Sequence, residues 1–485
     1  MSQNKINDKI INWELVAVNP TNKNWDWKDL FCFWGVNIQS IIGFSLIASL
    51  YILYDLNIFV VFIGSILGSL LVYFFSNLIG RPSQKYGLPF ATLLRSSLGY
   101  SGARFFGFLR SLVGIFMFGI QTYFLSKAIS YLIRILFFTI DSSILDKDIF
   151  LTFLLGLNII DWLSLIICLV IQIYIFSKGM LFNRRLINFS AIAVYLGLLI
   201  FLLIVLLTDV RLTAKVFLSI FTYENLFDQN NFIPIITVAG TIFAYFSIVI
   251  ISLGDFTRYI KNENELRYGN LSLFINLIIF SIFAVFIVLG SDIFLNQKVE
   301  NLERIFTNPT DIIGKFDNLQ ITVIVLFFII IASASTNLIA NFIPSQYSLI
   351  NFQPNKLNLK KVSYTIGFFS LIIAILWPTL LSQIGILSFI DTFGSFFGPI
   401  SGVIIIDYYL IKKSNINVKD IHLLSPKSSF YYSNGWHIKG VYSIIIGFIF
   451  ASSTIWNSNL MFLQSYAWII GAFFAGFIYY LLGKK

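Results

Sequence analysis

The stretch from Ile331 to Pro344 reads I-A-S-A-S-T-N-L-I-A-N-F-I-P. It interrupts an apolar run that begins at Ile321 and contains no charged side chain. Ser333, Asn337 and Asn341 are four residues apart, so they share one face of a helix. Polar groups in a helix of membrane-spanning length usually face a bundle interior or a water-filled cavity. Two interpretations remain open at this point: hydrogen bonds between helices, or a site for a cation or substrate.

Composition places the chain in a lipid bilayer. Its 485 residues are 57% hydrophobic and 12% charged, about half the charged fraction of soluble domains. Apolar runs of about 20 residues predict an all-α integral membrane protein, because a helix satisfies its own backbone groups in lipid. We expect twelve spans, at residues 30–53, 57–79, 106–137, 158–177, 186–208, 232–253, 271–294, 319–343, 362–381, 385–410, 438–456 and 462–482.

The basic residues predict the orientation of these spans. Most of the 33 Lys and Arg, with Arg95, Arg104 and Arg110 among them, fall on the side of the N-terminal segment. Lys and Arg are enriched in cytoplasmic loops, so we expect both termini in the cytoplasm and the protein in the plasma (inner) membrane. This topology explains the net charge of +10 without a nucleic-acid partner. The basic link 81–105 is expected to form a cytoplasmic amphipathic hairpin rather than an anion site.

Several spans carry polar residues near their middle. Gly35, Asn37 and Gln39 predict that span 1 unwinds there and frees carbonyl oxygens. In span 3, Gln121 is a buried amide with Met117 one turn earlier on the same face. Alone, such an amide is as consistent with an interhelical hydrogen bond as with a site.

Spans 6 and 10 also depart from a plain apolar pattern. Gly240 and Thr241 are expected to loosen span 6, Phe246 is aromatic at mid-span, and 255–258 holds an expected local ion pair between Asp255 and Arg258. Span 10 is rich in glycine, which makes it a candidate for a kink or gate. Its acid, Asp391, is a candidate for gating or proton transfer, with a cap near the outer surface as the alternative.

No set of catalytic residues is found in the sequence. The two histidines, His422 and His437, lie in one loop, and no metalloprotease, dithiol or phosphate-loop motif is present. The sequence therefore predicts no enzyme. A channel would need a polar stripe repeated in several spans. Polarity instead gathers at the middles of spans 1, 3, 6 and 8, which indicates one central site.

In this order, the four clusters resemble nucleobase–cation symporter family 1, which includes hydantoin, allantoin, cytosine and uracil permeases. The resemblance covers nearly the whole chain. Its motifs are Y-G-L-P-F-A-T-L-L-R-S-S-L-G (86–99), F-G-I-Q-T-Y (118–123), D-F-T-R (255–258), S-T-N-L-I-A-N (335–341) and G-P-I-S-G-V-I-I-I-D-Y-Y (398–409).

The resemblance implies a LeuT-type fold, with two inverted repeats of five spans and two further C-terminal helices. We accordingly expect a cytoplasmic N-terminal segment at 1–28, repeat 1 at 29–209 and repeat 2 at 210–411. A cytoplasmic loop at 412–437 and spans 11 and 12 at 438–485 complete the chain.

The resemblance also implies the site residues. A Na⁺ site is expected from the backbone oxygens of Gly35, Ile38 and Ala332 and from the hydroxyls of Ser335 and Thr336, a set of hard oxygen donors. Substrate contacts are expected from the amides Gln39, Gln121, Asn337 and Asn341, with Phe246 as a stacking wall. Hydantoin-type members have tryptophan where this chain has Met117, which indicates a substrate larger or less planar than hydantoin or uracil.

Together these features predict a symporter that imports a small neutral nitrogenous heterocycle or ureide by alternating access. Na⁺ is the expected coupling ion, and H⁺ coupling through Asp391 is the competing hypothesis. Within the family, nucleobases, allantoin, hydantoin, related vitamins and nucleosides all remain candidates. The competing classes of protein are an amino-acid symporter of LeuT type and a non-transporting receptor or scaffold. Besides the substrate and the bilayer, we expect no cofactor and no obligatory protein partner.

Overall fold

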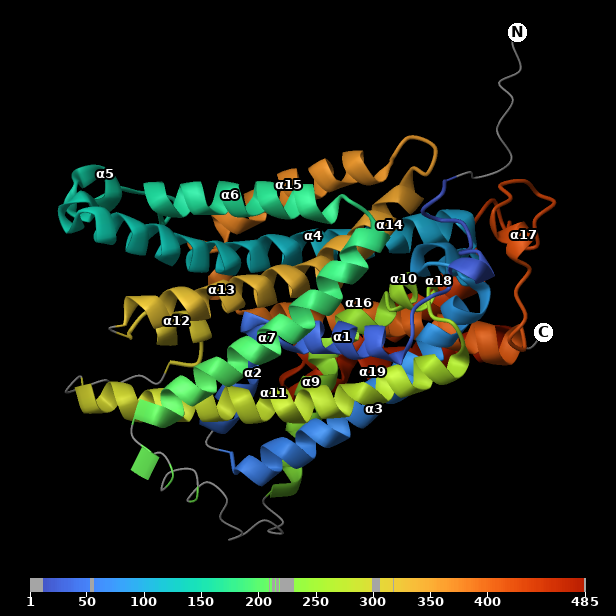
Figure 1. Cartoon of the computed structure of the whole chain (residues 1–485). Helices are drawn as coiled ribbons and strands as arrows, with labels where there is room; N and C mark the ends of the chain where they lie inside the picture. The colour runs from blue at the N-terminus through green and yellow to red at the C-terminus, as the bar shows by residue number, and fades with distance from the viewer. Residues whose placement is uncertain are drawn as a thin grey trace.

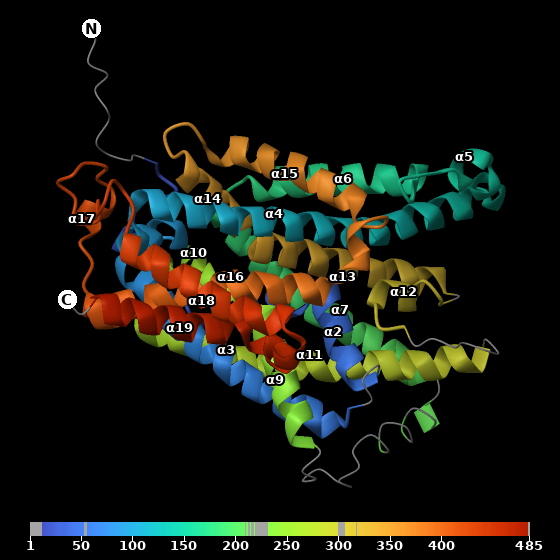
Figure 2. The same ribbon diagram turned by 180° about the vertical axis from the view of Figure 1, so that it is seen from behind.

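The computed structural model describes residues 12–52, 56–208, 231–298, 306–316 and 318–483, with the isolated positions 210, 211, 214 and 218. Long helices run roughly side by side, and the two described ends of the chain lie at one end of the bundle (Figures 1 and 2). Eleven helices are long and apolar enough to cross a membrane, and the bent pair α1–α2 forms a twelfth span. The expected number of spans is therefore confirmed within the described residues.

The helices follow the expected order. Spans 1 to 5 are α1 (Trp27–Ile38) with α2 (Ile41–Ile52), α3 (Ile58–Tyr86), α4 (Phe90–Ile140), α6 (Ile159–Phe176) and α7 (Met180–Thr208). Spans 6 to 10 are α9 (Phe232–Ile251), α11 (Glu263–Lys298), α13 (Leu319–Thr336) with α14 (Ile343–Phe352), α15 (Leu359–Leu376) and α16 (Ile386–Ile406). Spans 11 and 12 are α18 (Ile438–Trp456) and α19 (Ala467–Gly483).

Short elements join the spans. They are η1 (Pro20–Asn22), η2 (Ser142–Asp146), α5 (Asp148–Leu151), the hairpin β1 (Phe153–Leu154) and β2 (Leu157–Asn158), α10 (Gly254–Thr257), α12 (Pro309–Ile313), η5 (Leu381–Gln383), α17 (Val418–Ile421) and η7 (Ser458–Tyr466). The expected boundary between the repeats falls at residue 209, outside the described residues, as do residues 1–11 of the expected N-terminal segment.

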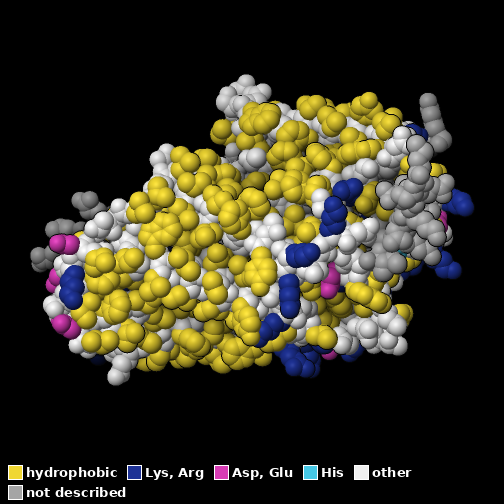
Figure 3. Space-filling model, turned by 90° about the horizontal axis from the view of Figure 1, so that it is seen from above, with side chains coloured by type: hydrophobic (Ala, Val, Ile, Leu, Met, Phe, Trp, Pro, Cys, Tyr) yellow, Lys and Arg dark blue, Asp and Glu magenta, His cyan; other side chains and the backbone are white. Residues whose placement is uncertain are grey.

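The surface and the interior have opposite chemistry. Figure 3 shows hydrophobic side chains over most of one face, while most visible Lys and Arg gather toward the end that carries the chain's two described ends. Large apolar side chains such as Phe189 and Ile192 of α7 are exposed, as expected of a helix facing lipid. Inside the bundle, many Ser, Thr, Asn and Gln side chains are buried, so the polar groups needed for a site lie in the interior.

Two spans are interrupted where their sequences carry polar residues. In span 1, α1 and α2 meet at 67° around Gln39 and Ser40, close to the expected break. In span 8, a π-helical segment, η4 (Asn337–Phe342), separates α13 from α14. Pro344, the second residue of α14, has no N–H to donate, which accounts for the irregular backbone before it. Both interruptions place polar side chains and free carbonyl groups near the centre of the bundle.

The link 81–105 differs from the expected amphipathic hairpin. α3 continues through Pro82 to Tyr86, and α4 begins at Phe90 with a non-helical residue, Gly99, inside it (φ 77°). Residues 87–99 are buried throughout, with Arg95 bonded to Asn351 of α14. This segment packs into the protein, so the expectation of a surface hairpin is wrong, and Arg95 is not a loop charge.

Span 6 also differs from expectation. α9 is continuous through Gly240 and Thr241, and the interruption comes later, at 252–253, before α10. The expected ion pair between Asp255 and Arg258 is not formed within the described residues. Asp255 instead accepts a hydrogen bond from the backbone N–H of Phe90 at 3.0 Å. The buried charges that follow span 6 therefore face other parts of the bundle.

Close helix packing explains the glycines of span 10. A Cβ atom at Gly398 would lie 2.1 Å from the carbonyl oxygen of Trp468, and one at Gly402 would lie 2.0 Å from that of Ala472. Only glycine permits this approach of α16 to α19. α16 is continuous over Ile386–Ile406, so these glycines serve contact with span 12 rather than an interruption of the helix.

Residues 12–26 form an N-terminal strap across the end of the bundle. The side chain of Asn12 donates to the carbonyl oxygen of Pro354 at 2.8 Å, beyond span 8. The backbone of Val18 bonds to Gly87, between spans 2 and 3, and that of Trp25 bonds to Tyr259, beyond span 6. The strap therefore joins three separate links at the same end of the molecule.

Candidate functional site

The break in span 1 leaves the carbonyl groups of Val36, Asn37 and Ile38 at the end of α1 without their usual helical donors. Of the two carbonyl groups that we expect to bind a cation, that of Gly35 accepts the ordinary helical bond from the N–H of Gln39 at 3.0 Å. That of Ile38 accepts from the N–H of Ser40 at 2.8 Å. A carbonyl oxygen has a second lone pair, so both groups remain able to bind a ligand.

The carbonyl groups of Val36 and Asn37 bind hydroxyl groups from distant spans. The hydroxyl of Thr336 in α13 donates to Val36 at 2.6 Å. The hydroxyl of Tyr245 in α9 donates to Asn37 at 3.3 Å and lies 2.7 Å from the hydroxyl oxygen of Ser40. The break in span 1 is thus held by span 8 on one side and by span 6 on the other.

The expected cation ligands from span 8 lie together at this junction. The hydroxyls of Ser335 and Thr336 are each 3.0 Å from the carbonyl oxygen of Ala332, and all three residues are buried. The donor set is made of carbonyl and hydroxyl oxygens, which suits a hard monovalent cation such as Na⁺. Within the described part of the chain, no group of three or more His, Cys, Asp or Glu side chains could hold a metal ion.

A central cavity lies beside this junction. It is enclosed by residues from spans 1, 3, 6, 8 and 10, namely Asn37, Ser40, Ile42, Met117, Gln121, Tyr245, Ile248, Val249, Thr336, Ala340, Asn341 and Ile390. Of the expected substrate contacts, the structure brings Met117, Gln121 and Asn341 together on this cavity. Thr336 connects the cavity with the candidate cation site.

A row of hydrogen-bonded side-chain amides determines which atoms of Gln121 and Asn341 face the cavity. The Nδ2 of Asn337 faces the carbonyl oxygen of Phe118 at 3.2 Å, which can only accept. The Oδ1 of Asn337 therefore accepts from the Nδ2 of Asn341, at 2.9 Å. That Nδ2 also donates to the Oε1 of Gln121 at 3.1 Å, and the Nε2 of Gln121 reaches the carbonyl oxygen of Ser333 at 3.4 Å. The backbone carbonyls of Phe118 and Ser333, at the two ends of this row of amides, require the same orientation of the amide groups.

This orientation determines what the wall can offer a ligand. Both hydrogens of the Asn341 amide nitrogen are used, so its oxygen is left to accept a hydrogen bond. The nitrogen of Gln121 uses one hydrogen on Ser333 and retains one to donate. A ligand that presents an N–H beside a C=O matches this acceptor and donor.

Asn337 lies behind the wall rather than on it. Its amide group donates to Thr122 of α4 at 3.1 Å and to Gln172 of α6 at 2.9 Å, and the side chain is fully buried. The expectation of a direct substrate contact is corrected, because spans 3 and 4 cover this side chain. Asn337 positions Asn341 instead.

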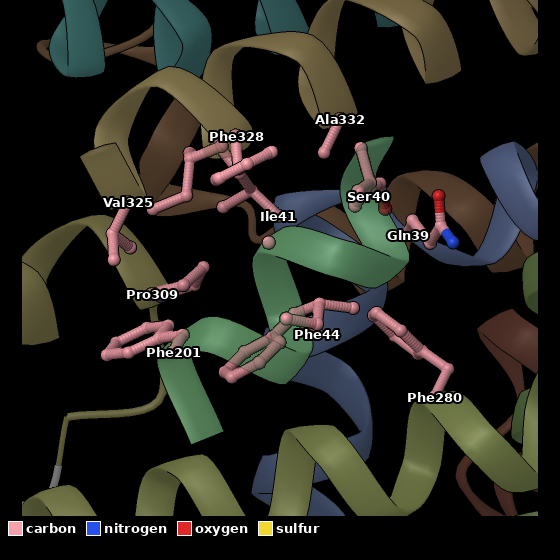
Figure 4. A pocket seen from close by; sticks show the side chains of 14 residues that line it. Gln39, Ser40, Ile41, Phe44, Phe201, Phe280, Pro309, Val325, Phe328 and Ala332 are labelled. Carbon is pink, nitrogen blue, oxygen red and sulfur yellow. The ribbon is translucent and has the colours of Figure 1, made fainter. Parts of the chain in front are cut away.

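Gln39 lines a separate side cavity, at the edge of the residues labelled in Figure 4. Its Nε2 lies 3.5 Å from the carbonyl oxygen of Ala191, and its Oε1 is buried without a partner. Apart from Gln39 and Ser40, the lining is apolar, with Phe44, Phe201 and Phe280 among the labelled side chains. The helix break at Ile38 turns Gln39 away from the central cavity, so its expected place there is corrected.

Phe246 is also absent from the central cavity. It is 1% exposed and packs edge-on against Trp34 with ring centroids 6.0 Å apart. Its neighbour Tyr245 lines the cavity instead. Sequence reasoning missed Tyr245, Ser40 and the lining role of Asn37. A tyrosine one position from the chosen aromatic residue was the available signal.

A wider vestibule adjoins the central cavity, since Ile42 and Ile390 line both. Asp391 lines this vestibule and is 8% exposed. Within the described residues it has neither a hydrogen bond nor an ion pair. Asp391 therefore lies on the vestibule and does not line the central cavity.

A twelve-span bundle with a broken helix at an enclosed polar site defines a membrane transporter. The sequence profile of permeases for cytosine/purines, uracil, thiamine and allantoin matches residues 17–481. The chain belongs to this permease family, as its motifs indicated. It is a multi-pass transporter, and its relatives are permeases rather than enzymes.

Two relatives match nearly the entire chain. A purine-uracil permease of Arabidopsis thaliana is 24% identical over 100% of this chain and 80% of its own. A putative allantoin permease of Escherichia coli (strain K12) is 25% identical over 97% of this chain and 94% of its own.

Solved structures confirm the LeuT-type fold. A nucleobase-cation-symport-1 family transporter in a closed conformation with bromovinylhydantoin bound superposes with a TM-score of 0.74, at 16% identity, over 97% of this chain and 95% of its own. A Na⁺-coupled sialic acid symporter in a substrate-bound outward-open state superposes with a TM-score of 0.64, at 14% identity, over 96% and 91%.

Proposed function

We propose that this permease imports a small neutral nitrogenous heterocycle or ureide together with Na⁺, by alternating access. The orientation of Gln121 and Asn341 is the observation that carries the proposal. One offers an N–H and the other a carbonyl oxygen, which complements the adjacent C=O and N–H groups of a nucleobase, hydantoin or allantoin. The curated relatives named above are permeases for ligands with such groups.

Neutrality follows from the lining of the central cavity. No Lys, Arg, Asp or Glu side chain is among its described lining residues. An ionised ligand would therefore lose its hydration without gaining a counter-charge, which is costly in a buried site. Met117 supplies a flexible apolar surface in place of a rigid stacking ring, so a larger or less planar ligand also fits the proposal.

Na⁺ coupling is supported by the oxygen donors at the junction of spans 1 and 8. Ser335 and Thr336 would hold the ion together with the carbonyl groups of Gly35, Ile38 and Ala332. The positive charge would stabilise the broken end of α1, where carbonyl dipoles converge. Proton coupling through Asp391 is the competing proposal, since that carboxyl is buried and lines the vestibule.

An amino-acid symporter is the second candidate. α2 begins at Ile41 beside the central cavity, and Ile42 lines it. A helix N-terminus with free N–H groups attracts a carboxylate. Competition between an amino acid and a nucleobase for the same uptake activity separates the two candidates.

Uptake by purified protein in proteoliposomes tests the proposal. Radiolabelled uracil, purines, allantoin, hydantoin, thiamine and amino acids are supplied with an inward Na⁺ gradient, an inward H⁺ gradient or neither. We expect one heterocycle or ureide to accumulate above equilibrium only with Na⁺. A protein that binds a ligand but gives no gradient-driven flux would be a receptor. Accumulation driven by the H⁺ gradient alone would show that the coupling ion is H⁺ rather than Na⁺.

A further inference from the structure

Arg110 is a fully buried arginine in α4, two turns before Met117. The sequence interpretation counted it among the loop charges that set the topology, but the structure places it inside the bundle. Its Nη2 donates to the carbonyl oxygen of Ala340 at 2.9 Å, to Ser252 Oγ at 3.1 Å and to the carbonyl oxygen of Ile248 at 3.3 Å. One guanidinium group thus joins span 3 to spans 6 and 8.

The two carbonyl groups held by Arg110 are those that lack an ordinary helical donor. The donor expected for Ala340 is the N–H of the residue four positions later, but that residue is Pro344. The donor expected for Ile248 is the N–H of Ser252, which turns to Ile250 where α9 ends. Arg110 therefore supplies a hydrogen-bond donor to one carbonyl group that lacks its helical donor in each of two interrupted spans.

These contacts close the central cavity on one side. Ile248 and Ala340 both line that cavity. Beyond them, α10 and α14 lead toward the end of the bundle that carries the two described ends of the chain (Figure 1). The vestibule adjoins the cavity elsewhere, at Ile42 and Ile390. The central cavity therefore borders the vestibule at these two residues and is bounded by the Arg110 contacts at Ile248 and Ala340.

Arg110 and Asp255 are oppositely charged, and each has unused bonding atoms. The Nε and Nη1 of Arg110 are buried without partners, and so is the Oδ2 of Asp255. The other Asp255 oxygen accepts from Phe90, the first residue of the helix that carries Arg110. The charge of Arg258 also acts on Asp255, but its guanidinium donates to the backbone carbonyl oxygen of Glu14 and to the hydroxyl of Tyr259. Unpaired buried charges are costly, which favours a second arrangement that joins them.

We propose that Arg110 is a positioning residue that keeps the central cavity closed at Ile248 and Ala340, on the side of the chain's two described ends. When this side opens, the guanidinium of Arg110 pairs with Asp255. In the closed arrangement, Arg110 bonds the carbonyls of Ile248 and Ala340. In the open arrangement, it leaves these carbonyls and pairs with the free oxygen of Asp255. The inference rests on the alternating access proposed above, but its test needs no transported substrate.

The test uses one reporter cysteine on the cavity wall. In a protein with Cys32→Ala and Cys168→Ala, Val249→Cys is labelled by a membrane-impermeant maleimide from each side of sealed vesicles. We expect Arg110→Gln to raise labelling from the side of the termini by at least about tenfold, since hydrogen bonds to a charged group shift an equilibrium by roughly that factor. Arg104→Gln is the matched control, because Arg104 lies on the same helix and donates to the carbonyl oxygen of Phe352.

Asp255→Asn provides a second, independent outcome. It keeps an acceptor for Phe90 but removes the charge that receives Arg110, so labelling from the side of the termini is expected to fall below that of the parent. The proposal is overturned if a folded Arg110→Gln protein labels like the parent, or if Arg104→Gln raises labelling equally. The proposal is also overturned if Asp255→Asn leaves the labelling of Val249→Cys from the side of the termini unchanged. Failed uptake of every ligand, with these labelling changes present, would contradict only the proposed function.

Discussion

Thr336 donates its hydroxyl to the carbonyl oxygen of Val36 at 2.6 Å, across 300 residues of sequence. This bond joins the broken end of span 1 to the middle of span 8. The same hydroxyl lies 3.0 Å from the carbonyl oxygen of Ala332 and lines the central cavity. A single side chain thus touches both the candidate cation site and the candidate substrate site, which gives coupling a direct physical route.

Replacing Thr336 by valine is expected to weaken Na⁺ dependence. The substitution keeps the shape but leaves buried oxygens without their donor, which costs about 1–3 kcal/mol. The Na⁺ concentration for half-maximal uptake should rise by roughly five- to 100-fold. Thr322→Val is the matched control, since Thr322 is buried on the same helix but its hydroxyl bonds only to the carbonyl oxygens of Asn318 and Ile313, outside the candidate site. Uptake that ignores Na⁺ and collapses in Asp391→Asn would instead assign the coupling to a proton.

Removing the side chain of Asn341 is expected to abolish selective binding without unfolding the protein. Asn341→Ala deletes the acceptor that faces the cavity, so substrate affinity should fall by roughly five- to 100-fold, measured by binding at saturating Na⁺. Asn337→Ala should lower the melting temperature more, because it strips partners from spans 3 and 4. If Asn341→Ala lowers stability but the folded protein keeps its affinity, these amides only tie helices together.

Exchanging Met117 for tryptophan is expected to shift selectivity toward small planar rings. A rigid ring adds a stacking surface worth about 0.5–1.5 kcal/mol, or roughly a two- to tenfold preference, and takes space from bulkier ligands. The comparison is the ratio of uptake for uracil and a larger substituted ligand. Phe116→Trp is the control, because Phe116 faces Phe389 instead. An unchanged ratio would remove Met117 from the substrate site.

The orientation in the membrane can be tested with two exposed positions. Lys85 lies at the end of α3 beside the N-terminal strap, and Ser143 lies in η2 at the opposite end of the long helix α4. Cysteines placed there should react with an impermeant reagent from opposite sides of the membrane, with Lys85→Cys reacting from the cytoplasm. Reaction of both from one side would reject the twelve-span topology.

Asp255, in the short helix α10 beyond the end of span 6, predicts a pH dependence of stability. Burial raises its pKa to about 7, against the lowering effects of Arg258, the N–H of Phe90 and Arg110. Folding therefore favours the protonated carboxyl, so this contribution to stability is largest below the ordinary pKa of 3.8 and is lost as pH rises through about 7. The melting temperature of the parent should fall relative to Asp255→Asn between about pH 4 and 7. Melting temperatures of the parent and of Asp255→Asn that change in parallel with pH would contradict this assignment.

The number of spans and the placement of Met117, Gln121 and Asn341 on one cavity were predictable because they depend on local chemistry. Apolar runs of membrane length determined the helices, and the amides of Gln121 and Asn341 stood out within them. The spacing of Asn337 and Asn341 also predicted a shared helix face, and their side chains do bond at 2.9 Å. That spans 3 and 4 cover Asn337 depends on packing between distant segments, which spacing cannot show.

The remaining errors arose where a helix ends or a charge is buried. Span 6 stays helical through Gly240, so the cavity meets Tyr245 rather than Phe246. The turn after Ile38 likewise redirects Gln39. Arg110 carries the same sequence signal as a loop arginine, and only the tertiary structure shows that it bonds to defects in two other spans.

The N-terminal strap has a consequence for biosynthesis. It is made first, yet the carbonyl of Pro354 that holds Asn12 is made 342 residues later. At about 5–20 residues per second, roughly 20–70 s pass before that contact can form. Until then the strap has no complete docking surface at the cytoplasmic face we predict for it. The strap can therefore dock completely only after span 8 has been translated. In a chain released from the ribosome earlier, the strap would stay undocked and be exposed to proteolysis.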